Sequence, residues 1–242
     1  MELNKHLTAE SLIECLQVLE DKQKAKFLQG FFKTGKGQYA EGDIFLGIKV
    51  PETRQVAKAF QRIPIIEVEK VLKSVYHEVR LCGLMILVEK FKKAGEAEKK
   101  MIVDFYLSNT QYINNWDLVD LSCYRILGNY LLDKPRDILY RLAKSNNMWE
   151  QRMAIVSTWT FIRNREFEDT LSISEILLDH PHDLIHKAVG WMLRELSKRD
   201  ELLMLQFIQT HYHKISRTTL RYAIERLPQE ARKNIMKGEV EL

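Results

Sequence analysis

Apolar residues recur at spacings of three and four positions along most of this chain, and that spacing is the period of an α-helix. Only 5 prolines and 10 glycines punctuate the pattern, so we expect an all-α protein. A first helix is predicted to begin near Thr8, whose hydroxyl can cap it with Ser11 close behind, and to break near Asp21. Further short helices are predicted at residues 51–62, 65–75, 77–93 and 96–108.

The helical pattern fails between Thr34 and Lys49, a stretch that contains four glycines. A long loop inside a compact domain is often functional, and an ordered crossover that packs Phe45 and Leu46 is the alternative. Helical spacing resumes at Pro51, a residue suited to the first turn of a helix. The sequence leaves both interpretations of the loop open.

The predicted helices are of two kinds. Some, such as Leu81 to Val88, are apolar nearly all round and need cover on several sides, whereas others, such as Pro135 to Lys144, are amphipathic and can provide it. Steps of 36, 36, 35 and 35 residues from Arg80 reach positions near predicted helix starts, namely Trp116, Arg152, Lys187 and Tyr222. A period of about 35 to 40 residues fits a two-helix, HEAT-like unit. We therefore predict HEAT-like helical repeats that form a curved α-α superhelix (solenoid), as a single domain over residues 1–242.

Composition narrows the classes of function. The 45% of hydrophobic residues can supply a full core, and the net charge of +4 is too small to identify a nucleic-acid partner by itself. The three cysteines are far apart and form no CxxC pair, which argues against a disulfide framework or a zinc site and favours the reducing cytoplasm. Neither a secretory signal nor an apolar run of about 18 residues is found, so secretion and a membrane location are not expected.

Trp116 and Asp120 are the main candidates for chemistry. They are four residues apart, so on a helix they lie about 40° apart around the axis and share a face. Asp120 has apolar neighbours such as Leu118 and Leu121, among which an isolated buried carboxylate would cost several kcal/mol. The nearby Asp117 falls in the first turn behind an asparagine cap, a position that the helix dipole already explains.

The repeat places charged and aromatic residues at equivalent positions. Such positions line one surface of a solenoid, so we expect a concave face formed by Trp116, Asp120, Arg152, Lys187 and Trp191. Cations suit phosphates and aromatic faces suit sugars or bases, so this face suits nucleic acid. A carboxylate repels phosphate, so Asp120 on this face indicates that a positively charged group is bound beside it. Cleavage of an N-glycosidic bond develops positive charge on the sugar, and an ion pair of about 4 kcal/mol is worth roughly a thousandfold in rate.

Several stretches of the chain match a known family. They are Phe45–Ile48 with Pro51, Glu52, Arg54 and Gln55; Trp116, Asp117, Val119 and Asp120; Asn147–Trp149 with Gln151, Arg152, Ala154 and Ile155; and His186–Trp191 with Leu193–Glu195. On these residues the chain resembles, over most of its length, the bacterial DNA alkylation repair proteins, a family of AlkD-like HEAT-repeat DNA glycosylases.

The resemblance implies a hydrolase that excises N3- or N7-alkylated purines, of the 3-methyladenine and 7-methylguanine type, from double-stranded DNA. It implies no metal, no cofactor and no extrusion of the base into a pocket. Asp120 matches the catalytic carboxylate, and Trp116 and Trp191 match aromatic walls around the lesion. Expected DNA contacts are Arg152, Ser216 and Arg217 from the resemblance, and Lys187 and Arg221 from the repeat register. We expect a monomer in the bacterial cytoplasm, with the nucleoid and without an obligatory protein partner.

Three features depart from the family pattern. Asp183 and Leu184 stand where an aromatic pair precedes the tryptophan helix, and Phe27 stands in place of an N-terminal tyrosine. The first change removes stacking surface and adds negative charge, which bears on DNA affinity and on the range of lesions. The glycine-rich loop from Tyr39 to Gly47 is also longer, as in a sister subgroup whose substrate differs.

Other interpretations stay open. Tryptophans at helical spacing are commonly core residues, and Trp149 and Trp159 are assigned to the core or its edge. His182 and His186 are four apart, but no third ligand is in register, so no metal site is expected. The rival functions are a non-catalytic DNA-structure binder and a HEAT-repeat scaffold that binds protein. Neither of them needs the carboxylate of Asp120 for chemistry.

Overall fold

The computed structural model describes residues 7–240, which form α-helices joined by turns and loops and contain no strand. Residues 1–6 and 241–242, which the predicted domain includes, lie outside the described residues. The chain divides into two compact units, of which the first ends at Ser122 and the second begins at Cys123. The all-α fold is therefore confirmed, whereas the single domain stays a prediction.

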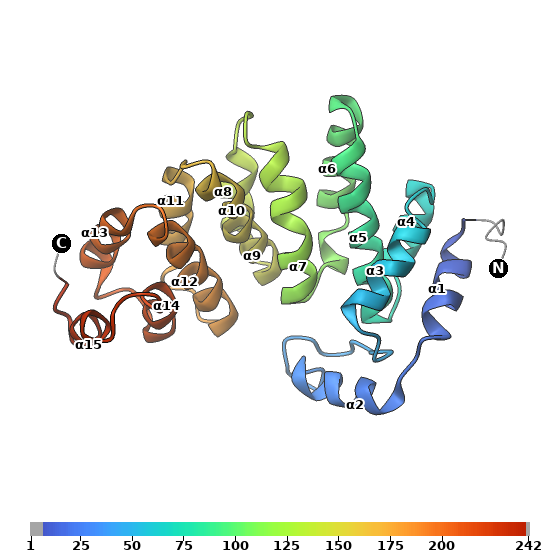
Figure 1. Ribbon diagram of the computed structural model, residues 1–242, viewed down its shortest axis with the longest axis horizontal. Helices are drawn as coiled ribbons and strands as arrows, with labels where there is room; N and C mark the ends of the chain where they lie inside the picture. Colours follow the sequence, from blue (N-terminus) through green and yellow to red (C-terminus); the bar gives the residue numbers. More distant parts are fainter. Residues whose placement is uncertain (1–6, 241–242) are drawn as a thin grey trace. The chain divides into compact units, whose positions relative to one another are not determined.

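The first unit is built around one buried helix. Its elements are α1 (Ala9–Gln17), α2 (Lys22–Phe31), α3 (Val50–Ala59), α4 (Ile65–Leu72), α5 (His77–Lys93), α6 (Glu96–Ser108), the 3₁₀ turn η1 (Thr110–Tyr112) and the start of α7 (Trp116–Cys123). Every residue from His77 to Val88 is buried, because α1, α3, α4 and α6 all pack against α5 (Figure 1). This is the cover expected for a helix that is apolar nearly all round.

Local sequence sets several helix ends as predicted. The Thr8 hydroxyl accepts a hydrogen bond from a backbone N–H of α1, and the carboxylate of Asp21 caps α2 at the predicted break. Pro51 lies in the first turn of α3. Helix α3 ends at Ala59, three residues before its predicted end, because the chain turns ahead of Pro64.

The second unit shows the predicted repeat. It contains the π-helical turn η2 (Tyr124–Gly128), α8 (Asp137–Ala143), α9 (Met148–Ser157), α10 (Trp159–Arg163), α11 (Glu168–Leu177), α12 (Asp183–Ser197), α13 (Glu201–His211), α14 (Arg217–Ala223) and α15 (Gln229–Lys237). Helices α8 and α9 pack as a pair, as do α11 and α12, and α12 also packs against α9 and α14 (Figure 1). The helices that carry Arg152, Lys187 and Tyr222 therefore follow one another through this unit. Among residues 7–240, no helix is both long and apolar enough to cross a bilayer.

The close packing of α12 on α14 requires a glycine. A Cβ at Gly190 would lie 2.5 Å from the Cβ of Tyr222 and 2.6 Å from the carbonyl oxygen of Thr219. Gly190→Ala is expected to lower the free energy of unfolding by about 1–3 kcal/mol, because the two helices must move apart. Gly30→Ala in α2, where no atom lies within 4 Å of the added carbon, should be neutral or raise it by up to about 1 kcal/mol. Urea denaturation followed by circular dichroism measures both, and equal effects would contradict this packing.

Candidate functional site

The loop between α2 and α3 is ordered by one buried carboxylate. Glu78, in the first turn of α5, accepts hydrogen bonds from three successive backbone N–H groups, at 2.9 Å from Leu46, 2.8 Å from Gly47 and 3.2 Å from Ile48. Gly47 has a φ of 83°, and a Cβ there would lie 2.2 Å from a carbonyl oxygen at the start of α2. Phe45 and Leu46 are buried, which confirms that this loop is an ordered, packed crossover.

A second set of buried polar groups joins this loop to the start of α7. The imidazole of His77 lies between two carboxylates, with Nδ1 3.1 Å from Oδ2 of Asp43 and Nε2 2.8 Å from Oδ2 of Asp117. Asp43 also accepts a hydrogen bond from Arg80 at 2.6 Å and one from the side-chain amide of Asn115 at 3.4 Å. We name these five residues the buried ion network. It ties the loop, α5 and α7 together.

Opposite charges are paired inside the buried ion network. Burial by itself would lower the pKa of His77, but the charge of Asp117 and hydrogen bonds with Asp117 and Asp43 raise that pKa to about 9. Burial by itself would raise the pKa of Asp43. Hydrogen bonds and charges from His77 and Arg80 nevertheless hold the pKa of Asp43 below its ordinary value. His77 is therefore an imidazolium at neutral pH.

The buried ion network also positions the first turn of α7. Asn115 Oδ1 accepts a hydrogen bond from the backbone N–H of Trp116 at 2.8 Å, and Asp117 Oδ1 accepts one from the backbone N–H of Leu118 at 2.9 Å. The sequence assigned Asp117 to the helix dipole alone, but its other oxygen binds His77, 40 positions away. Trp116 and Asp120 are thereby held on a helix whose start is fixed.

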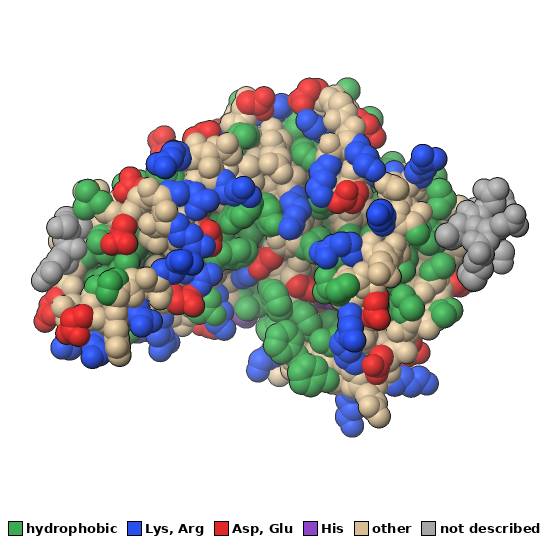
Figure 2. All heavy atoms as spheres, viewed as in Figure 1, with side chains coloured by type: hydrophobic (Ala, Val, Ile, Leu, Met, Phe, Trp, Pro, Cys, Tyr) green, Lys and Arg blue, Asp and Glu red, His purple; other side chains and the backbone are tan. Residues whose placement is uncertain are grey.

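Aromatic rings stack beside Trp116 in the first unit. Its indole lies on Phe32, with ring centroids 5.2 Å apart and planes 14° apart, and Phe32 in turn lies on Phe45 at 4.8 Å. Phe31 meets the indole edge-on at 6.3 Å. Phe31 is 55% exposed and Phe27 is 69% exposed, so apolar surface stays open beside α2 (Figure 2). We name these five residues the aromatic cluster, and Phe27 and Phe31 form its exposed side.

Asp120 lies one helical turn after Trp116 and is partly exposed, whereas Leu118 and Val119 beside it are buried. Helix α7 includes both candidates, so the indole and the carboxylate lie on one helical face, as the spacing predicts. A partly buried carboxylate beside an indole is suited to meeting a cation.

In the second unit, a predicted DNA contact is paired with the residue that departs from the family pattern. Lys187 forms an ion pair with Asp183 at 2.8 Å, and both side chains are more than a third exposed. The hydrogen bond from Lys187 is the largest influence on Asp183 and lowers the pKa of its carboxyl. Trp191 lies one turn further along α12 and is partly exposed. The charge of Lys187 is therefore paired within α12, and its contact with DNA stays a prediction.

Arg152 is buried, in contrast to the open position expected from the repeat register. It is 5% exposed, and its guanidinium donates a hydrogen bond to the carbonyl oxygen of Leu184. A buried guanidinium needs such an acceptor, and this one links α9 to α12. Its contact with DNA stays a prediction.

The remaining predicted DNA contacts lie on α14 and at its N-terminal cap. Ser216 caps this helix by accepting a hydrogen bond from the backbone N–H of Thr219 at 3.1 Å. Arg217 donates to the carbonyl oxygen of Met236 at 2.6 Å, and Arg221 is exposed. The structure places Trp116 and Asp120 together in the first unit and the predicted DNA contacts in the second. Their convergence on one face stays a prediction.

The histidines before α12 make local hydrogen bonds. His180 Nδ1 accepts from the backbone N–H of His182 at 3.0 Å, and His182 Nδ1 accepts from that of Leu184 at 3.1 Å. Over residues 7–240, no group of three or more His, Cys, Asp or Glu side chains is arranged to hold a metal ion.

Sequence reasoning did not single out His77, Asp43 or Phe32. One signal was present, because a His-Glu pair opens a helix that is apolar nearly all round from Leu81 to Val88, and buried charges need partners. The sequence does not show, however, that the partner is Asp43, which lies 34 positions earlier in a loop. Phe32 follows α2 directly, and its contact with Trp116 also depends on how the loop folds back.

Comparison with known proteins identifies a family. A family model described as DNA alkylation repair enzyme matches residues 12–227. A solved structure, described as a predicted DNA alkylation repair enzyme from Enterococcus faecalis, aligns with a TM-score of 0.70 over 87% of this chain and 97% of its own, at 16% sequence identity. At that identity the likeness shows the fold alone, and it confirms the predicted class of an α-solenoid of helical repeats. No curated protein matches the chain.

The buried ion network predicts a pH dependence of stability that His77 carries. Its pKa is raised from 6.5 to about 9 on folding, so the stabilisation is complete below about pH 6.5 and is lost as the pH rises through about 9. A shift of this size corresponds to about 3 kcal/mol of unfolding free energy. His77→Gln should remove this part of the pH dependence. Urea denaturation between about pH 6 and about pH 10 measures it.

The exposed residue His213 supplies the control for this measurement. His213→Gln should leave the wild-type pH dependence intact, because this side chain is not part of the buried ion network. The same pH dependence in the wild type and in His77→Gln would contradict the assigned role of His77.

Proposed function

The chain belongs to the DNA alkylation repair enzyme family, and on that premise we propose that it is a DNA glycosylase. Its proposed substrates are purines alkylated at N3 or N7, such as 3-methyladenine and 7-methylguanine, in double-stranded DNA. The observation that carries this proposal is the pairing of the Trp116 indole with the Asp120 carboxylate on one face of α7. A partly exposed acid one helical turn from an indole is suited to a cationic substrate.

The bond to be broken joins C1′ of the deoxyribose to a nitrogen of the purine. The base leaves with the bonding electron pair, which neutralises its positive charge, and C1′ takes on oxocarbenium character. Asp120 stabilises that cation and orients the water that adds to C1′, and the water's proton passes to the carboxylate or to solvent. Trp116 presents the negative face of its π system to the same charge.

Preorganisation of α7 supports this mechanism. The first turn of the helix is held by Asn115 and by the bond between Asp117 and His77, so the carboxylate of Asp120 need not be repositioned as charge develops. At about 4 Å and an effective dielectric constant of about 20, the ion pair is worth about 4 kcal/mol, or roughly a thousandfold in rate. The exposed ring of Phe31 adds stacking surface for a nucleotide beside Trp116.

The second unit is proposed to hold the DNA. Its proposed contacts are Arg152, Lys187, Ser216, Arg217 and Arg221, with Trp191 as a second aromatic wall. Cations at these positions would neutralise backbone phosphates and make binding dependent on salt. Arg152 already donates to the carbonyl oxygen of Leu184, and Lys187 already pairs with Asp183, so phosphate would share these side chains with internal partners.

Asp120→Asn tests the proposed chemistry. It is expected to lower the single-turnover release of 7-methylguanine from methylated duplex DNA by roughly a hundredfold to a thousandfold, because the sugar cation loses its counter-charge. Affinity for duplex DNA should be unchanged or higher, since a negative charge near phosphate is removed. Chromatography of the released base and fluorescence anisotropy of labelled DNA measure the two effects. The matched control is Asp104→Asn, an exposed acid of α6, which should release base at the wild-type rate.

The same assays separate the rival functions. Salt-dependent DNA binding without base release above the spontaneous rate, even with wild-type protein in excess, would sink the glycosylase proposal for this substrate and favour a non-catalytic DNA-structure binder. Absence of salt-dependent DNA binding in both the wild type and Asp120→Asn would instead favour a protein-binding scaffold.

Asp183→Asn tests whether Lys187 contacts DNA. The variant removes the carboxylate that pairs with this lysine at 2.8 Å, and pairs on the surface are worth up to about 1 kcal/mol. Affinity for unmodified duplex DNA should therefore rise about twofold to fivefold in anisotropy titrations. The exposed residue Asp179 provides the control, because Asp179→Asn makes the same change of charge without releasing Lys187. Equal affinity gains in both variants would show only a general effect of charge.

A further inference from the structure

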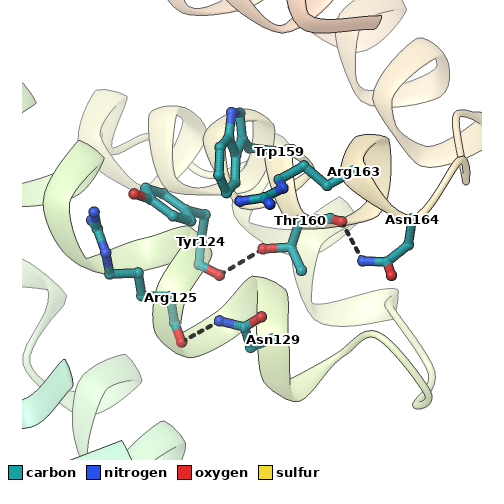
Figure 3. Close-up of a pocket in the computed structure, with 7 residues that line it drawn as sticks. All are labelled: Tyr124, Arg125, Asn129, Trp159, Thr160, Arg163 and Asn164. Carbon is teal, nitrogen blue, oxygen red and sulfur yellow. Dashed lines mark hydrogen bonds between the residues drawn. The ribbon is translucent and has the colours of Figure 1, made fainter. Parts of the chain in front are cut away.

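The second unit contains a polar pocket that the proposed chemistry does not use. Its volume is about 520 Å³, and it lies between the π-helical turn η2 and α10 (Figure 3). The side chains that line it include Tyr124, Arg125 and Asn129 on one wall and Trp159, Arg163 and Asn164 on the other. We name it the arginine pocket. Its lining includes two guanidinium groups and no acidic side chain.

Hydrogen bonds hold the two walls of the arginine pocket in place. Thr160 Oγ1 donates to the carbonyl oxygen of Tyr124 at 2.8 Å and so ties α10 to η2 (Figure 3). Asn129 and Asn164 each donate to the carbonyl oxygen four residues earlier in their own wall, at 2.9 Å and 2.8 Å. A π-helical turn departs from regular helix geometry, and such turns are frequent at functional sites. The pocket is therefore formed before any ligand arrives.

Both arginines of the pocket are held against aromatic rings. The Cζ atom of Arg125 lies 4.3 Å from the ring centre of Tyr124, and that of Arg163 lies 4.8 Å from the ring centre of Trp159. The ring centroids of Tyr124 and Trp159 are 4.5 Å apart, and the ring planes are inclined at 53°. A guanidinium held in this way loses little freedom when its N–H fork binds the oxygens of a phosphate.

The lining of the pocket favours a phosphate group that is part of a larger molecule. A bare ion would occupy a small part of about 520 Å³ and would gain little from two aromatic rings. A nucleic-acid strand supplies phosphate oxygens for guanidinium groups and, next to them, sugars and bases for aromatic faces. The absence of acids among the lining residues suits the same ligand.

We propose that the arginine pocket binds a phosphodiester group of a DNA strand. Arg125 and Arg163 donate hydrogen bonds to its non-bridging oxygens, and the rings of Tyr124 and Trp159 contact the adjoining nucleotide. The choice of DNA as the bearer of the phosphate rests on the proposed function. The pocket residues themselves are distinct from those proposed for base excision, so the failure of one proposal can be told apart from the failure of the other.

The test is a pair of double substitutions in the full-length chain. Arg125→Ala with Arg163→Ala is expected to weaken binding of unmodified duplex DNA about tenfold or more at about 0.1 M salt. The slope of log K against log salt concentration should fall by about 1, as expected for one lost phosphate contact. Lys58→Ala with Arg62→Ala removes two exposed cations at the end of α3 and should preserve both affinity and slope. Circular dichroism melting verifies that each variant is folded.

A conservative pair keeps the test decisive. Arg125→Lys with Arg163→Lys retains the charge but lacks the planar fork, so it should restore most of the salt slope and only part of the affinity. Full wild-type affinity in this lysine pair would overturn the arginine-specific contact. A wild-type salt slope in the folded alanine pair would overturn the pocket as a phosphodiester site.

Inorganic phosphate distinguishes a free anion from a DNA strand. The fluorescence of Trp159 is taken as the difference between the wild type and Trp159→Phe. Inorganic phosphate added to about 10 mM is expected to leave this fluorescence nearly unchanged. A large change, together with unaltered DNA binding by the alanine pair, would assign the pocket to free phosphate and overturn the proposal. Release of 7-methylguanine reports separately on the proposed function. A reduced salt slope in the alanine pair, without base release by the wild type, would support the pocket and contradict the glycosylase. Base release by the wild type, with an unchanged slope in the alanine pair, would support the glycosylase and contradict the pocket.

Discussion

A buried imidazolium between two carboxylates is the interaction on which the first unit depends. His77 binds Asp43 of the loop and Asp117 of α7, and the adjacent Glu78 binds three backbone N–H groups of the same loop. One turn of α5 therefore orders a stretch with little regular structure of its own and fixes the start of the helix that carries Asp120. Desolvation of these charges is costly, but each has an opposite charge or several hydrogen-bond donors beside it.

The two units use polar groups in different ways. In the first, charges are buried and paired, which gives a fixed helix and a stable stack of rings beneath Trp116. In the second unit, cations near the surface contact either a carboxylate or an aromatic ring. Lys187 is neutralised by Asp183, whereas Arg125 and Arg163 lie on aromatic rings in a pocket with no acidic lining residue.

Sequence reasoning was most successful where the relevant residues are close in the chain. Trp116 and Asp120 share a face because one helical turn separates them, and Thr8 and Asp21 cap helices because capping needs only neighbouring residues. The repeat register placed Arg152 at the start of a helix but did not reveal that its side chain is buried. That residue is buried because the chain 32 positions later, at Leu184, covers it and accepts its hydrogen bond.

The sequence by itself determined the helical class, the repeat of about 35 residues and the family, because each depends on periodicity or on short motifs. The tertiary structure alone decided which charges are buried and which rings meet. The partners of His77 lie 34 and 40 positions away, and Phe32 reaches Trp116 from another helix end. Such pairings depend on how a glycine-rich loop folds back over α5, and no local spacing in the sequence encodes that path.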